Sequence, residues 1–187
     1  MKDPILLLDT SIVSLMGRER PPPGLRSWLL RVGIDRLAIC YPVIAELLRG
    51  AHLREKDNPE KAQEVKAWVA RILATKFPMP DMDPEVADIY ARMTSIPRLK
   101  NLWVVQRNQK VARLGHDLMI ASVAIAHKTP IVTDNITDFM SIHDEFPLPG
   151  IYHPMNTRWY VPPGFEVPLP VFNASEPDPH DALLPMM

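Results

Sequence analysis

Apolar residues in this chain form short continuous runs, separated by longer stretches with helical spacing. Ile5 to Leu8 is one such run, and it stops abruptly at Asp9. Strands that are buried on both faces of a parallel sheet have this pattern. Four other short runs predict further strands: Leu37 to Cys40, Phe77 to Pro80, Pro130 to Thr133, and Gly150 to Tyr152.

Helical signals lie between these predicted strands. Val65, Val69 and Ile72 recur at helical spacing, and Asn58 followed by Pro59 is a typical helix start. The predicted helices run from Ser11 to Gly17, from Pro21–Pro23 through Val32, from Pro42 to near Gly50, from Pro59 to about Leu73, from Pro84 through Met93, and from His116 to His127. This alternation of strands and helices predicts an α/β fold with a central, mainly parallel sheet flanked by helices.

The composition changes near Pro154. Ten of the 21 prolines lie from Pro147 onward, and the last residues have neither helical nor strand periodicity. We therefore expect one folded domain over residues 1–154, followed by a Pro-rich extended arm or disordered tail over residues 155–187.

Charge and cysteine content narrow the function classes. The net charge is −1, so a nucleic-acid site would have to be a local patch. The single cysteine, Cys40, lies in an apolar run and indicates neither a disulfide framework nor a zinc site. No apolar stretch is long enough for a signal peptide core or a membrane span, so we expect a cytoplasmic protein that does not insert into membranes.

Carboxylates stand where the apolar pattern would not place them. Asp9 and Asp134 follow predicted buried strands, Glu46 interrupts an apolar helix, Asp117 opens another, and Asp138 follows Asp134 by four residues. The carboxyl ends of parallel strands line the ligand crevice of such folds. A carboxylate cluster without His or Cys suits Mg²⁺, or Mn²⁺ in its place, rather than zinc.

Each of these residues also has a purely structural interpretation. Asp9 or Ser11 could cap a helix, Asp117 could favour the helix dipole, and Asp138 could be a turn residue. Glu46 could pair with Arg49 along one helix face. His116 could be catalytic or structural, and Thr10, Ser11 and Thr133 could bind the carboxylates or act as ordinary caps.

The order and spacing of four motifs are more specific than any single acid. LLLDTSIVS, IAELLRG, GHDLMIASVAIAH and PIVTDNITDF together resemble the PIN-domain family, in particular toxin ribonucleases of the VapC and FitB type. The resemblance covers about Ile5 to Tyr152, with a weakly matched middle. It implies a three-layer α/β fold, magnesium-dependent cleavage of RNA, a homodimer, and a cognate antitoxin that masks the site.

The resemblance also assigns site residues. It implies that Asp9, Glu46 and Asp117 gather around one or two magnesium ions. For the fourth position we favour Asp138, with Asn135 or Asp134 as alternatives. The family chemistry would be endonucleolytic hydrolysis of a phosphodiester, leaving a 5′-phosphate and a 3′-hydroxyl, with Glu46 or Asp138 orienting the attacking water or accepting its proton.

An acid-free segment between Asp88 and Asp117 is the local source of positive charge. Arg107, Lys110 and Arg113 are the candidate RNA contacts within it, and Trp103 is either a stacking platform for a base or a core residue. Two rival functions remain. One is an RNA-binding PIN module with weak or no catalysis, and the other is an aspartate-nucleophile phosphohydrolase, which would normally have a second acid where this chain has Ser11.

Overall fold

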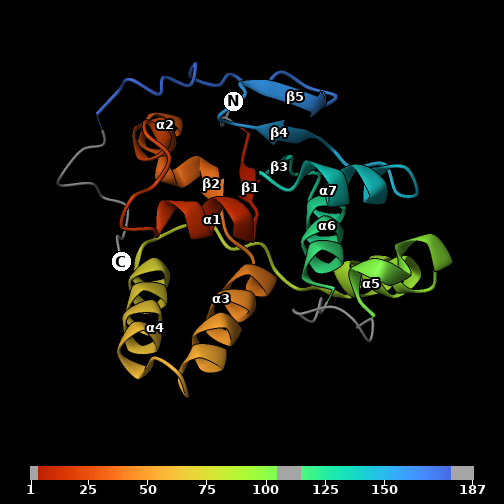
Figure 1. Ribbon diagram of the computed structural model, residues 1–187. Helices are drawn as coiled ribbons and strands as arrows, with labels where there is room; N and C mark the ends of the chain where they lie inside the picture. The colour runs from red at the N-terminus through yellow and green to blue at the C-terminus, as the bar shows by residue number, and fades with distance from the viewer. Residues whose placement is uncertain (1–3, 105–114, 178–187) are drawn as a thin grey trace.

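The computed structural model describes residues 4–104 and 115–177, and within these ranges its centre is a five-stranded sheet (Figure 1). The strand order is β2-β1-β3-β4-β5. β2, β1, β3 and β4 run parallel to one another, whereas β5 is antiparallel to β4. The strands are β1 (Leu6–Leu8), β2 (Leu37–Ala38), β3 (Ile131–Val132), β4 (Ile151–His153) and β5 (Arg158–Val161). The predicted α/β fold with a mainly parallel sheet is confirmed.

Helices cover both faces of the sheet. Figure 1 shows α5, α6 and α7 grouped on one side of the central strands, and α1, α2 and α4 on the other. α3 contacts α1, α4 and α6. The helices are α1 (Thr10–Met16), α2 (Leu25–Val32), α3 (Tyr41–Arg54), α4 (Pro59–Ala74), α5 (Pro84–Thr94), α6 (His116–Ala126) and α7 (Ile136–His143), with 3-10 turns η1 (Ile34–Arg36) and η2 (Pro97–Leu102).

Local sequence explains several helix starts. Asn58 accepts a hydrogen bond from the Lys61 amide at 3.0 Å, and Asp83 accepts one from the Val86 amide at 2.9 Å. Both side chains satisfy amides that the first helical turn leaves without partners. The predicted starts of α4 and α5 are therefore confirmed.

The core is continuous from the sheet into the helices on both faces. β1 and β3 are fully buried, and Trp28 of α2, Trp68 of α4 and Phe139 of α7 are the largest side chains that are almost completely buried. α6 is apolar nearly all round, as its sequence predicted, because α3, α5 and α7 all pack against it. No helix in the described part of the chain is both long and apolar enough to cross a bilayer.

Two helix boundaries differ from the prediction. The prolines at 21–23 precede α2 rather than forming its first turn, because Gly24 adopts a left-handed conformation (φ 78°) directly before Leu25. Gly50 does not end α3, which continues to Arg54. Packing against α4 and α6 offsets the roughly 1 kcal/mol that a helical glycine costs relative to alanine.

Phe77 to Pro80 is not a strand. Pro78 and Pro80 have no amide hydrogen to donate to a ladder, and the segment makes a single bond to the sheet region, from the Ile39 amide to the Pro78 carbonyl at 3.0 Å. α7 was also missed, since its first turn was interpreted as a possible turn segment around Asp138.

The sheet extends past residue 154. Arg158–Val161 form β5, which pairs with β4 after a turn closed by a bond from the Thr157 amide to the Pro154 carbonyl at 2.9 Å. Beyond β5 the chain lies extended across α2, where the Trp28 indole donates to the Pro170 carbonyl at 2.8 Å (Figure 1). We call residues 162–177 the arm. These residues form no helix or strand, and the bond to Trp28 ties them to the folded domain.

Candidate carboxylate site

The site lies at the carboxyl ends of β1 and β3. These strands pair in parallel, so the residues that follow them, Asp9 and Thr133, come out at the same edge of the sheet. Asp9 also caps α1, where its side chain accepts a bond from the Ser11 amide at 3.3 Å. One residue thus continues a buried strand and opens a helix.

Asp9 is the most enclosed of the predicted site residues, with 2% of its surface exposed. Its Oδ2 atom accepts hydrogen bonds from the hydroxyls of Ser11 at 2.6 Å and Thr133 at 2.8 Å. Burial raises the pKa of Asp9, and these hydrogen bonds only partly offset that effect, while the charge of Glu46 adds to it. Ser11 and Thr133 therefore bind the carboxylate, which was one of their two predicted roles.

Glu46 comes from the second turn of α3 and is partly buried. Burial raises its pKa, but His116, Thr10 and Arg49 outweigh that effect, so the pKa of Glu46 is lowered overall. The His116 Nδ1 atom lies 3.5 Å from Glu46 Oε2, which is long for a hydrogen bond. That carboxylate oxygen is buried and has no hydrogen-bond partner of ordinary geometry.

Asp117 and Asp138 reach the site from α6 and α7, on the other side of the sheet. Gly115 precedes α6 with φ 71°, a left-handed conformation that favours glycine, and so sets the direction in which Asp117 leaves the helix start. Asn135, just before α7, donates from its amide to Asp138 Oδ2 at 3.0 Å and to Asp117 Oδ2 at 3.4 Å. The amide bridges the two acids.

The three candidates for the fourth position do not all lie in the same place. Asp138 and Asn135 line the same cleft as Asp9, Glu46 and Asp117, and Asp134 does not. Asp134 is half exposed and pairs with His153 Nε2 at 3.0 Å. The His153 pairing had no signal in the sequence, because β4 brings it to the sheet edge from a distant part of the chain.

The cleft has a volume of about 330 Å³ and is lined by oxygen-bearing side chains. Its lining residues are Asp9, Thr10, Ser11, Ser14, Glu46, Asp117, Asn135 and Asp138. Oxygen atoms alone suit a hard cation such as Mg²⁺. Within residues 4–104 and 115–177, however, no three His, Cys, Asp or Glu side chains lie close enough together to hold a metal ion directly as a group.

The proposed RNA contacts Arg107, Lys110 and Arg113 lie outside the described residues. Two other cations of that basic segment are engaged: Arg92 pairs with Asp88 at 3.9 Å, and Arg98 with Glu145 at 3.0 Å. Trp103 is partly buried and packs against the hydrophobic core, and its indole nitrogen is buried without a hydrogen-bond partner. This position favours the core interpretation of Trp103.

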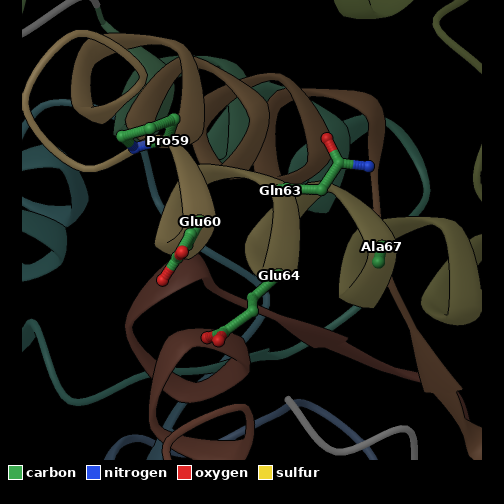
Figure 2. A pocket seen from close by; sticks show the side chains of 5 residues that line it. All are labelled: Pro59, Glu60, Gln63, Glu64 and Ala67. Carbon is green, nitrogen blue, oxygen red and sulfur yellow. The ribbon is translucent and has the colours of Figure 1, made fainter.

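Another hollow, on the outer surface of α4, does not resemble a catalytic site. Figure 2 shows its five lining side chains, with the carboxylates of Glu60 and Glu64 directed away from the amide of Gln63. All five come from one helix, and Glu64 is already paired with Lys61 at 2.8 Å. The carboxylate cleft, which collects residues from four separate segments of the chain, remains the candidate site.

A model of the PIN domain matches residues 6–139, which include all four acids of the cleft. The chain belongs to the PIN domain family. PIN domain proteins are nucleases. A comparison with curated proteins found no match.

Solved structures with this PIN fold include three protein complexes. VapBC2 from Rickettsia felis, bound to a DNA fragment from its promoter, is 21% identical with a TM-score of 0.52, covering 83% of this chain and 98% of that one. FitAcB from Neisseria gonorrhoeae is 22% identical with a TM-score of 0.51, covering 73% and 92%. VapBC-1 from nontypeable Haemophilus influenzae is 22% identical with a TM-score of 0.51, covering 75% and 93%. At these identities the likeness establishes the fold.

Proposed function

We propose that this PIN domain is a magnesium-dependent endoribonuclease whose catalytic centre is the carboxylate cleft. The observation that carries the proposal is that Asp9, Glu46, Asp117 and Asp138 leave four different elements and line one cleft. Packing of side chains alone would not bring four carboxylates together, because their mutual repulsion is costly until a cation offsets it.

The cleft suits a magnesium ion in its chemistry. Burial and the nearby Glu46 raise the pKa of Asp9, so a cation there would relieve an existing electrostatic cost. Glu46 Oε2 is buried, and its contact with His116 Nδ1 at 3.5 Å is too long for an ordinary hydrogen bond, so this oxygen could bind a cation or a metal-bound water. Mg²⁺ usually keeps several waters and takes only one or two protein carboxylates, so it does not need three acids in direct contact. Asp9, Glu46, Asp117 and Asp138 would hold it directly or through water.

The reaction would be hydrolysis of an RNA phosphodiester. A bound magnesium ion supplies charge neutralisation at the phosphate and a more acidic water. Glu46 Oε2 or Asp138 would accept the proton as water oxygen bonds to phosphorus. The bond from phosphorus to the 3′ oxygen then breaks, and that oxygen takes up a proton to become the 3′-hydroxyl.

Four side chains hold the carboxylates in place or stabilise their charge. Ser11 and Thr133 hold Asp9 Oδ2 through their hydroxyls. The Asn135 amide bridges Asp117 and Asp138, and so fixes the distance between them. His116, beside Glu46, stabilises the ionised form of that carboxylate.

We further propose that the protein is the toxin of a toxin–antitoxin pair and acts as a homodimer in the cytoplasm. The support is the resemblance to VapC and FitB toxins, together with the shared fold of VapBC and FitAB complexes. A neighbouring reading frame for a small DNA-binding protein that co-purifies with this chain would support the pairing. Absence of any growth defect on induced expression would contradict a toxin.

The rival aspartate-nucleophile chemistry has weaker support. Position 11 carries Ser11 instead of a second acid, and its hydroxyl is committed to Asp9. Incubation with a small phosphoester and denaturing mass spectrometry tests for a covalent aspartyl phosphate, which we expect to be absent.

The direct test of the nuclease is cleavage of a labelled single-stranded RNA and of a DNA strand of the same sequence. We expect internal cuts in the RNA with 5′-phosphate ends in magnesium or manganese, and none with EDTA. RNA that is bound but left uncut in magnesium would instead indicate a PIN module that binds without catalysis. Cleavage that persists in EDTA would contradict the metal dependence.

A further inference from the structure

A second depression adjoins the carboxylate cleft. It has a volume of about 460 Å³, lies between α1, α3 and α4, and shares Thr10, Ser14 and Glu46 with the cleft. We call it the arginine groove. Because the two share three lining residues, they form one continuous depression with the carboxylates at one end.

The charge of the groove is opposite to that of the cleft. Its cations are Arg18, just after α1, and Arg49 and Arg54 on α3, and its only acid is the shared Glu46. Arg18 and Arg54 are exposed, and Arg49 is partly buried. The ion pairs formed among the described residues include none of these three arginines.

The floor of the groove is apolar and firmly packed. Leu47, Val65 and Trp68 line it and are at most 9% exposed. Gly50 also lines it, and a β-carbon added there would meet no atom within 4 Å. A side chain at position 50 would therefore project into open space in the groove.

We propose that the arginine groove holds the RNA strand on one side of the scissile phosphodiester, with Arg18, Arg49 and Arg54 contacting its phosphates. This inference rests on the proposed ribonuclease function and adds the path of the substrate. Between Glu46 and Arg54 the groove follows α3 for about 12 Å, at 1.5 Å per residue. Guanidinium groups suit phosphate oxygens, since they can donate two parallel hydrogen bonds.

The charge arrangement favours a nucleic-acid strand over an acidic protein segment. An RNA strand places phosphates along the arginines and one phosphodiester at the acidic end, where a divalent cation would offset the repulsion. An acidic peptide would also bind arginines, but its carboxylates gain nothing from reaching Asp9 and Glu46.

The experiment measures RNA binding to full-length protein that carries Asp117→Asn, in magnesium, so that the RNA is not cut. Fluorescence anisotropy of a short labelled single-stranded RNA gives the affinity over a range of salt concentrations. In this background, Arg18→Gln, Arg49→Gln and Arg54→Gln together should weaken binding about tenfold or more. The slope of log affinity against log salt should fall by about 2, at roughly 0.7 for each phosphate contact on a single strand.

The matched control removes three positive charges elsewhere. Lys61, Lys76 and Lys128 are exposed and line neither the cleft nor the groove, so changing all three to Gln should leave affinity and slope nearly unchanged. Replacing the three arginines by Lys should restore most of the salt slope. Restoration by charge alone would not be expected if the arginines only supported the fold.

Gly50→Glu provides a second variant that should fold. Glutamate favours a helix more than glycine does, and its side chain would enter the open groove. We expect unchanged or higher thermal stability together with weaker RNA binding. Unchanged RNA binding in a folded Gly50→Glu protein would argue against a strand in the groove.

The experiments distinguish failure of the groove inference from failure of the proposed ribonuclease function. If wild type cleaves RNA and the arginine variant binds it with unchanged affinity and slope, the groove inference alone is overturned. If wild type neither binds nor cleaves RNA, both are overturned. If polyglutamate binds wild type but not the arginine variant, while RNA affinity is equal in both, the groove takes an acidic protein segment and the inference fails.

Discussion

At the scale of single residues, the acids that line the cleft could be picked out in the sequence because they break apolar patterns. Asp9 ends a buried strand and Glu46 interrupts an apolar helix, and both line the cleft. The sequence could not rank Asp134 against Asp138, because the two differ only in what approaches them from elsewhere. His153 on β4 pairs with Asp134, whereas the Asn135 amide donates to both Asp138 and Asp117.

Asp9→Asn tests the electrostatic cost of the buried carboxylate. Since burial raises the folded-state pKa of Asp9 above its ordinary value of 3.8, its contribution to stability is present at low pH and is lost as pH rises through the raised pKa. In EDTA, Asp9→Asn should therefore be more stable than wild type at neutral pH, and the gain should shrink as pH falls toward 3.8. Thermal melting across pH checks this.

The asparagine oxygen can still accept from Ser11 and Thr133, so the comparison keeps those bonds. A variant that is less stable than wild type at neutral pH would mean that the charge of Asp9 supports the fold.

Asp138→Asn and Asp134→Asn form a matched pair for the fourth acid. Both remove one charge from neighbouring parts of the chain, but only Asp138 lines the cleft. Asp138→Asn should lose far more ribonuclease activity than Asp134→Asn, measured as initial rates on one RNA in magnesium. The opposite ranking would move the site to the end of β3.

Trp103→Ala distinguishes a core residue from a stacking platform. Truncating a fully buried tryptophan costs about 3–5 kcal/mol, and Trp103 is only partly buried, so we expect a smaller loss with little change in RNA affinity. Melting and RNA anisotropy on the same sample decide the point. A loss of about 1–3 kcal/mol in RNA binding with unchanged melting would instead indicate base stacking.

At the scale of elements, helices and strands with strong local signals were predicted correctly, and those that depend on contacts between distant parts of the chain were missed. β1, α4, α5 and α6 have clear apolar patterns and start signals. β5 lies in a Pro-rich stretch, and its Arg-Trp-Tyr-Val run was overlooked although aromatic and β-branched residues are typical of strands. Tyr152 of β4 stacks on Trp28 with ring centroids 5.8 Å apart and lies 4.8 Å from Trp159, contacts that sequence spacing cannot reveal.

The arm should stabilise the domain through α2. The Trp28 indole donates to Pro170 and the Ser27 hydroxyl donates to the Pro177 carbonyl at 2.8 Å, whereas the Arg31–Glu176 pair is partly exposed and worth about 0–1 kcal/mol. A chain ending at Val161 should melt at a lower temperature than the full chain.

Trp28→Phe is the finer test, since it keeps an aromatic ring but removes the donor. It should cost about 1 kcal/mol for the lost bond, plus a packing term, because Trp28 is fully buried. For a chain of this size about 1 kcal/mol corresponds to roughly 2–4 °C in Tm. Equal melting temperatures of the full and truncated chains would mean that the arm does not stabilise α2.

At the scale of the whole molecule, a net charge of −1 conceals two opposite local charges side by side. The acids of the cleft and the cations of the arginine groove come from elements that are scattered along the sequence. Folding α1 and α3 against each other brings Arg18 beside Arg49 and Arg54. The sequence pointed instead to the segment before Asp117, where positive charges are adjacent along the chain.

We propose that the carboxylate cleft is a magnesium-dependent catalytic site. Its most direct test is RNA cleavage by Asp117→Asn and Asp9→Asn, beside wild type, over a range of magnesium concentrations up to the millimolar range. We predict metal-dependent cleavage by wild type and loss of cleavage in both variants, with melting curves showing that each remains folded. Full activity of either variant at millimolar magnesium would contradict it.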